Sequence, residues 1–108
     1  MFIYFPPYSG LMDAMIILYR TKDIEPKFMT KIIEKLFGKV QKSNYGKYEY
    51  EVTGVIPKGA YIRPIRAVVI VKKEYHQKIT ELFDVYSVQY RVFGIKVDSD
   101  VFKNKDFF

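Results

Sequence analysis

Lysine, arginine and tyrosine residues recur together along two segments of the sequence, residues 39–47 and 61–66. Lysine and arginine neutralise the phosphates of a nucleic acid, and tyrosine rings offer faces on which bases stack. The pattern therefore predicts a surface that binds DNA or RNA without catalysis. The predicted site residues are Lys39, Lys42, Tyr45, Lys47, Tyr61, Arg63 and Arg66.

The net charge of the chain agrees with this prediction. Eighteen basic against twelve acidic residues give +6, and most of the excess lies in residues 20–47 and 58–78. Such a field attracts polyanions, although it can also serve solubility alone. Lys27, Lys31 and Lys35 recur every four residues. We expect this row to lie in solvent rather than to grip phosphate, because lysine stems commonly flank an apolar stripe with their heads in water.

Composition excludes several kinds of chemistry. The chain has no Cys, which excludes disulfides and thiol catalysis, and its single His76 is expected on the surface. The spacing of Asp98, Asp100 and Asp106 fits no calcium loop, so we expect them in a solvated tail. A metal-dependent nuclease using Asp98 and Asp100 is an alternative. We otherwise expect no metal, no cofactor and no enzymatic activity.

The length of 108 residues indicates one domain. No apolar run approaches the roughly 20 residues of a membrane span, so we expect a cytoplasmic protein without a membrane partner. Only three Gln and two Asn are present, which is a tendency of thermophile proteins.

Hydrophobic periodicity predicts six elements between an aromatic arm (1–13) and a polar tail (98–108). They are a strand over 14–19, a helix with Asp23 or Glu25 as its cap and Pro26 in its first turn that ends at Gly38, strands over 45–55 and 61–71, a helix over 72–86 and a strand over 88–97. Pro26 suits the start of the first helix and Gly38 its end. The order predicts an α+β fold: a ferredoxin-like βαββαβ sandwich, with a four-stranded antiparallel sheet and two helices on one face.

Alternation within the strands predicts which side chains enter the core. Tyr48, Tyr50 and Val52 share one face of their strand, which we expect to be the buried face. In this fold the strands over 45–55 and 61–71 are neighbours, so their basic and aromatic residues would share one surface. The apolar phase of the last strand changes beside Gly94, which predicts a bulge.

The strands over 14–19 and 61–71 are apolar on both faces, although two helices cover only one face of the sheet. An apolar second face must be covered in a soluble protein. A second copy of the chain, the aromatic arm and a stacked nucleic-acid strand are the three covers considered. We expect the first, which makes the protein a homodimer or a higher oligomer.

Two resemblances concern the fold. The stretch from Phe37 to Ser43 looks like one in the small ribonuclease-like proteins of CRISPR adaptation, a family that has an acidic residue at the end of its first strand. Tyr19 and Arg20 stand there instead, so the metal chemistry of that family is not carried over. The spacing from Met15 to Val97 is similar to that of PII-like and CutA-type trimers.

The second resemblance implies an alternative function. The protein would be a homo-oligomeric sensor or regulator that binds a small anionic ligand between subunits. Arg20, Arg66 and Arg91 would then lie at the cleft.

Overall fold

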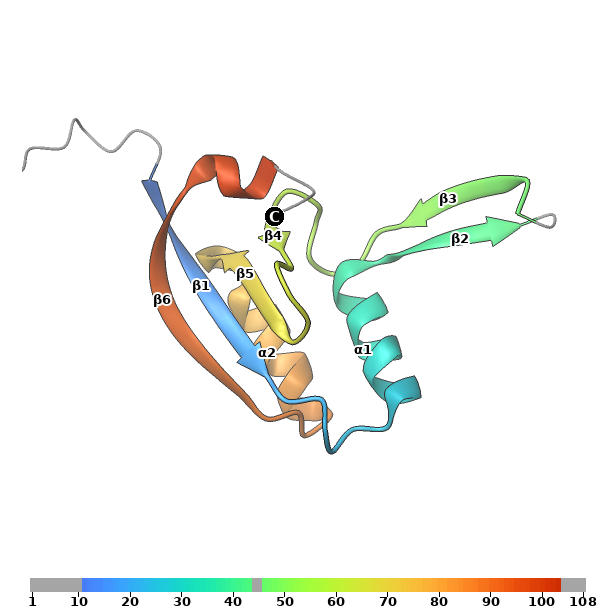
Figure 1. Cartoon of the computed structure of the whole chain (residues 1–108), viewed down its shortest axis with the longest axis horizontal. Helices are drawn as coiled ribbons and strands as arrows, with labels where there is room; N and C mark the ends of the chain where they lie inside the picture. Colours follow the sequence, from blue (N-terminus) through green and yellow to red (C-terminus); the bar gives the residue numbers. More distant parts are fainter. Residues whose placement is uncertain (1–10, 44–45, 104–108) are drawn as a thin grey trace, which may run out of the picture.

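The computed structural model describes residues 11–43 and 46–103. It has a mixed α+β fold with a four-stranded antiparallel sheet in the order β4-β5-β1-β6 and two α-helices (Figure 1). The strands of this sheet are β1 (Leu11–Tyr19), β4 (Tyr61–Ile62), β5 (Val68–Lys72) and β6 (Tyr90–Asp98). The helices are α1 (Pro26–Phe37) and α2 (His76–Val85), and the 3-10 helix η1 (Lys73–Tyr75) leads into α2.

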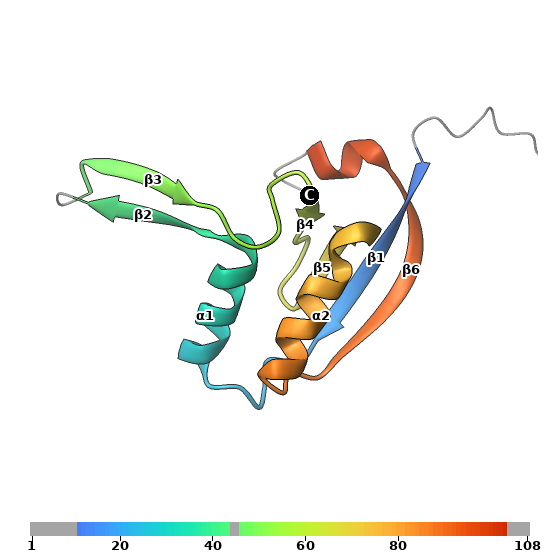
Figure 2. The same cartoon turned by 180° about the vertical axis from the view of Figure 1, so that it is seen from behind.

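The main core lies between the sheet and the helices. Ile17 of β1 and Val69 of β5 are fully buried there, together with Leu36 of α1 and Phe83 of α2. Figure 2, which views the molecule from the side opposite to Figure 1, shows α2 lying across the strands. The predicted helix with Pro26 in its first turn is confirmed, and Gly38 follows its last residue with a φ of 82°. Most of the apolar stripe of α1 and the centre of that of α2 are therefore buried as their spacing predicts, whereas Phe28 is 53% exposed.

The second face of the sheet carries a smaller core. Ala14, Ile62 and Ile70 are buried there against Phe102 of the 3-10 helix η2 (Ser99–Lys103). This helix belongs to the segment that the sequence led us to expect as a polar tail, and it was not among the covers considered for this face. Because η2 covers only part of the face, Phe93 remains 50% exposed.

Residues 39–52 form a separate two-stranded hairpin, made of β2 (Lys39–Ser43) and β3 (Tyr48–Val52). It projects away from the sheet and the helices (Figures 1 and 2). The burial of Tyr48 and Tyr50 predicted from alternation is wrong, because their side chains are 53% and 52% exposed. Alternation sets the two faces of a strand, but no second layer within residues 11–43 and 46–103 packs against this one.

The predicted neighbour relation between the strands over 45–55 and 61–71 is also wrong. β3 pairs with β2, whereas β5 pairs with β1 and with the two-residue strand β4. The residues between β4 and β5 include Pro64, which cannot donate a backbone hydrogen bond to a neighbouring strand. The long strand expected over 61–71 is therefore split in two.

β6 pairs with β1 without interruption from Asp98 opposite Leu11 to Tyr90 opposite Tyr19. The bulge predicted beside Gly94 is absent from this register. The apolar phase changes because both faces of the strand are packed: Val92 contacts the helix-side core and Ile95 the smaller one. β1 also begins at Leu11, three residues before the predicted start at position 14.

None of the helices in the described part of the chain combines the length and the apolar composition needed to cross a membrane.

Candidate functional site: a cleft with two arginines

A cleft of about 280 Å³ lies where the end of β1, the first half of α1 and the loop between β4 and β5 meet. We call it the arginine cleft, because that loop contributes Arg63 and Arg66 to its lining. The other polar residues that line it are Tyr19, Thr21, Thr30 and Glu34. The cleft therefore offers two guanidinium groups and several hydroxyl groups, all of which can donate hydrogen bonds to an anion.

Backbone hydrogen bonds hold the arginine-bearing loop against the sheet. The N–H of Tyr19 donates to the carbonyl oxygen of Ala67 over 3.0 Å, and the N–H of Val68 donates to that of Ile65 over 3.3 Å. Ala67 adopts a φ of 67°, an uncommon conformation for a residue other than glycine, which turns the chain into β5. The loop thus ends at a fixed point beside the end of β1.

Arg63 is oriented by two aromatic side chains. Its guanidinium carbon lies 5.2 Å from the centre of the Phe37 ring, which is within cation–π range. The guanidinium group also lies close enough to the side chain of Tyr19 for its charge to act on the pKa of the phenol. Arg63 therefore reaches the cleft from a position set by α1 and β1 together.

Tyr19 forms the inner wall of the cleft. Its ring is nearly buried and lies 5.0 Å, centre to centre, from the ring of Phe83. Burial raises the pKa of the Tyr19 hydroxyl, and the nearby positive charge of Arg63 opposes this rise. The hydroxyl is therefore protonated at neutral pH and can donate a hydrogen bond to a ligand.

The predicted hairpin lysines have partners of their own. The Lys39 ammonium lies 3.4 Å from the Glu34 carboxylate, and that of Lys42 lies 3.6 Å from Glu49. Lys47 sits above the ring of Tyr48, with 5.9 Å between the ammonium nitrogen and the ring centre. By contrast, neither arginine of the cleft forms an ion pair with a carboxylate among residues 11–43 and 46–103.

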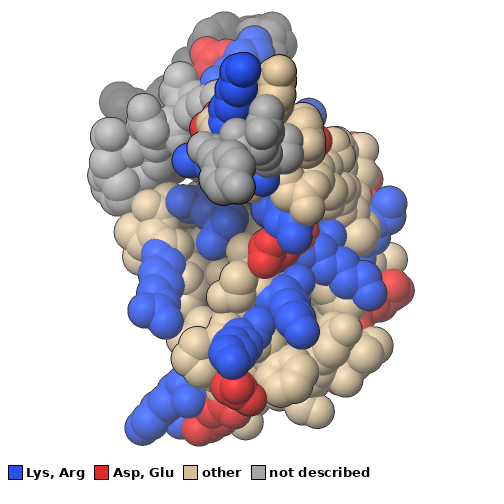
Figure 3. Space-filling view, turned by 90° about the vertical axis from the view of Figure 1, so that its right-hand side faces the viewer, with Lys and Arg blue, Asp and Glu red and all other residues tan. Residues whose placement is uncertain are grey.

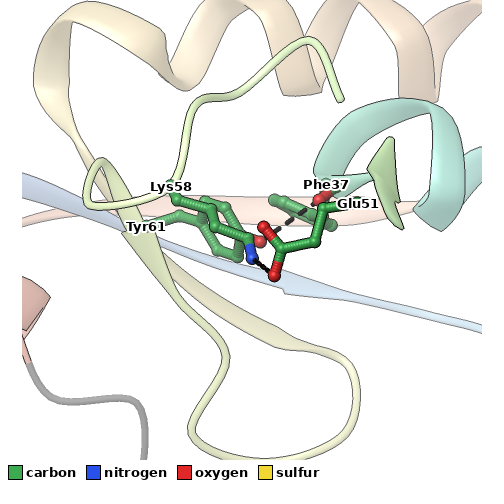
Figure 4. A network of polar contacts seen from close by, with 4 residues as sticks. All are labelled: Phe37, Glu51, Lys58 and Tyr61. Carbon is green, nitrogen blue, oxygen red and sulfur yellow. Dashed lines mark hydrogen bonds and ion pairs between the residues drawn. The ribbon is translucent and has the colours of Figure 1, made fainter. Parts of the chain in front are cut away.

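Tyr61 has a structural role at the base of the hairpin. Its hydroxyl donates to the carbonyl oxygen of Phe37 over 3.3 Å, and the centres of the two rings are 4.5 Å apart. Figure 4 shows this contact beside the ion pair between Lys58 and Glu51. One face of Tyr61 is therefore already occupied, which reduces its value as a platform for stacking a base.

The structure therefore divides the seven predicted residues. It brings Arg63 and Arg66 together in one cleft, and it distributes Lys39, Lys42 and Lys47 along the hairpin. Tyr45 lies outside the described residues. The lysine of this set nearest the cleft is Lys39, whose partner Glu34 is part of the lining.

The lysine row lies on α1, which also lines the cleft, but none of its three residues is part of that lining. Lys27, Lys31 and Lys35 are exposed and form no ion pair with any other described residue. At about 100° per residue, each lysine is turned away from the cleft residue that precedes it, Pro26, Thr30 or Glu34, so the row lies on another side of α1. Figure 3 shows the side of the molecule that carries α1 and the hairpin, where lysine and arginine side chains predominate. Sequence spacing had revealed this row, and the structure places it on another side of α1 from the residues that line the cleft with Arg63 and Arg66.

Arg20, Arg66 and Arg91 do not share one cleft. Arg20 and Arg91 line a hollow of about 510 Å³ beside the ends of β1 and β6, whereas Arg66 lines the arginine cleft. Arg20 also forms an ion pair of 3.3 Å with Asp23. Tyr19 lines both hollows, so its side chain separates them.

The acidic residues and the histidine have local roles. The carboxylate of Asp98 accepts the N–H of Asp100 over 2.9 Å, and Asp100 pairs with Lys103 over 3.4 Å. His76 lies with its Nδ1 atom 2.7 Å from the carbonyl oxygen of Lys73. Within the part of the chain that the structure describes, no three His, Asp or Glu side chains gather as metal ligands would. Asp106 is outside that part.

The residues that sequence reasoning missed are Tyr19, Thr21 and Thr30. Their only signal was position: Tyr19 ends an apolar strand, and Thr30 lies on the polar side of an amphipathic helix. Comparison of this chain with protein families, curated proteins and solved structures gave no match.

Proposed function

We propose that this protein binds nucleic acid without catalysis, through the arginine cleft and the lysine row of α1. The observation that carries the proposal is the contrast in ion pairing. Lys39 and Lys42 are paired with carboxylates, whereas the two arginines of the cleft and the lysine row have no such partner among the described residues. Several cations without a carboxylate partner favour a polyanion as the missing partner.

The geometry of the row favours a polymer over a small anion. Lys27 and Lys35 are two turns of helix apart, which corresponds to about 12 Å along the axis. Phosphates of one strand follow each other every 3.4 Å or so along a duplex axis, so the row spans several of them. The cleft would then hold one phosphate at the side of this track, between the guanidinium groups.

The experiment measures fluorescence anisotropy of labelled single- and double-stranded DNA and RNA at several salt concentrations. We expect binding that weakens steeply with salt. In a variant with Arg63→Ala and Arg66→Ala, the slope of log K against log salt should fall by about 2, because about one counterion is released per phosphate contact.

The control for net charge is a variant with Lys73→Ala and Lys78→Ala, which removes the same charge from η1 and α2. It should keep the wild-type slope. Absence of binding at low salt, or equal losses in the two variants, would contradict the proposal.

We also infer that the fold is ferredoxin-like with the hairpin as an insertion. Without β2 and β3, the elements run β1, α1, β4, β5, α2, β6, and the sheet order 4-5-1-6 places β1 and β5 in the centre. This is the βαββαβ arrangement with its first and third strands central. Replacing residues 40–51 by a short Gly-Ser linker should leave one cooperative unfolding transition, and its loss would contradict the inference.

A second candidate function is suggested by the hollow that Arg20 and Arg91 share. Two guanidinium groups there suit a small anionic ligand of a sensor or regulator. A ligand that binds the folded state raises the melting temperature. If this candidate is right, at least one of a panel of anionic metabolites raises the melting temperature of the wild type but not that of Arg91→Ala.

A further inference from the structure

The two edges of the sheet differ in length. β4 at one edge has two residues, whereas β6 at the other has nine. In the described part of the chain, no strand pairs with the outer edge of β6 (Figure 1). Soluble proteins rarely leave a long edge strand unprotected, because its free backbone groups are a template for another strand.

The direction of the free backbone groups follows from two hydrogen bonds. The N–H of Arg20 donates to the carbonyl oxygen of Gln89 over 2.8 Å, on the side of β6, and the N–H of Tyr19 donates on the opposite side, to Ala67. Because these directions alternate along paired strands, every second residue of β6 bonds to β1. The residues whose N–H and C=O groups point away from β1 are Tyr90, Val92, Gly94, Lys96 and Asp98.

We propose that two copies of this protein pair antiparallel through β6, about a two-fold axis at Gly94, and so join their sheets into one of eight strands. Gly94 is the midpoint of Tyr90–Asp98, so this register pairs the strand along its whole length. All five outward-facing residues then form hydrogen-bonded pairs. Gly94 bonds to the partner's Gly94, Val92 to the partner's Lys96, and Tyr90 to the partner's Asp98.

The side chains of β6 are compatible with this register. Phe93, which is 50% exposed in one copy, would lie opposite the partner's Ile95. Because of the two-fold axis, the dimer would contain this apolar pair twice. The basic residues Arg91 and Lys96 would lie opposite the partner's Val97 and Val92. A register centred on either basic residue would instead place two like charges opposite each other. Charge and hydrophobicity therefore favour the full-length register.

Edge pairing also fits the second face of the sheet better than the stacking of faces expected from the sequence. Phe102 of η2 already packs on that face, against Ala14 and Ile70. A second copy stacked on the face would have to accommodate η2. A second copy joined at β6 extends the sheet beside it, and it covers the exposed side chain of Phe93.

A single engineered cysteine tests the register, since the chain has no Cys. Residues opposite each other in a hydrogen-bonded pair have Cα atoms about 5.5 Å apart, within the range of a disulfide. We expect Gly94→Cys to form a disulfide-linked dimer on mild oxidation. Arg91→Cys should remain unlinked, because its two copies would be six strand positions, or about 20 Å, apart.

Two further measurements test the interface without a cross-link. The wild type should be a dimer by sedimentation, and Gly94→Pro, which removes an N–H that points away from β1, should raise its dissociation constant at least about tenfold. Gly94→Ala keeps that N–H, and its Cβ would meet only the Met15 sulfur, 3.9 Å away. It should therefore stay dimeric.

Hydrogen exchange of the wild type decides the matter even if the proline variant fails to fold. In the dimer the amides of Val92, Gly94 and Lys96 should be as protected as that of Phe93, which bonds to β1. A monomer at all concentrations would overturn the proposal. A dimer with fast exchange at these amides would also overturn it. The two copies would then associate through another surface, and the β6 edge would be left for a strand of another protein.

Discussion

Strands β3 and β5 each have five residues, and the sequence predicts both as strands, yet their surroundings are opposite. Val69 and Val71 of β5 are fully buried, whereas every residue of β3 is exposed. β5 lies between two other strands and under a layer of helices, and among the described strands β3 has only β2 beside it. The comparison shows that alternation of side chains determines a strand but not what packs against it.

The same two regions differ in the way their charges are used. Lysines of the hairpin are close to carboxylates of the hairpin or of α1, so part of their field is cancelled locally. The loop before β5 carries Arg63 and Arg66 without such partners among the described residues. The hairpin has the more regular Lys-Tyr pattern, yet it is less suited than the loop before β5 to bind a phosphate.

Truncation of a large side chain in each region gives the largest expected difference. Phe83→Ala should lower the free energy of unfolding by about 3–5 kcal/mol, because it leaves a cavity in the main core. Tyr48→Ala in the hairpin should change it by about 0.5 kcal/mol or less, as surface substitutions do. Urea denaturation followed by circular dichroism measures both. Similar losses would mean that the hairpin packs against the body in solution.

Alanine substitution of two glycines, one at the base of the hairpin and one near its tip, allows these two places to be compared. Gly38 and Gly46 have nearly equal φ values, 82° and 83°, so an alanine at either is strained by a similar amount. A Cβ at Gly38 would collide with the backbone of Val52, whereas one at Gly46 meets nothing within 4 Å.

We therefore expect Gly46→Ala to cost about 1 kcal/mol and Gly38→Ala about 2–5 kcal/mol in unfolding free energy. Thermal and urea denaturation of both variants provide the measurement. Equal costs would show that the close approach of Gly38 to Val52 is not maintained in solution.

The smallest expected effect concerns the buried phenol of the body. Burial raises the pKa of Tyr19 above its ordinary value of 10.0, with Arg63 opposing the rise. The resulting stabilisation is fully present below pH 10 or so and is lost as the pH rises through the folded-state pKa. Tyr19→Phe should therefore lose stability less steeply above pH 10 than the wild type.

Arg63→Gln removes the opposing charge, so it should move the pKa of Tyr19 further upward. Carbon NMR of the tyrosine rings follows this titration directly. A pKa of Tyr19 that is unchanged or lower in Arg63→Gln would show that the guanidinium group does not lie beside the phenol in solution.

Much of the secondary structure follows from local pattern. Pro26 and Gly38 enclose α1 as predicted, and the apolar stripe of α2 faces the core at Ile79 and Phe83. The strand β1 is apolar on both faces, and both of its faces are packed. Each of these features depends on neighbours within a few residues, so the sequence alone suffices to predict it.

The candidate site was predictable only in part. Arg63 and Arg66 were named because basic and tyrosine residues recur together in residues 61–66, and the structure places both in one cleft. Tyr19 and Thr30 join them from positions 33 or more residues away in the chain. Contacts over such separations leave no periodic signal, so no local pattern could have indicated them.

Composition and spacing thus determined the charge, the absence of thiol chemistry, both helices and the positions of β1 and β6 to within a few residues, since these depend on residue type and near neighbours. Only the tertiary structure decided that β2 and β3 leave the sheet, that Phe102 returns to cover part of its second face, and that β6 is the outermost strand on its side among the described residues. The physical reason is that a strand's sequence specifies its two faces, whereas its partners are chosen by packing across the whole chain.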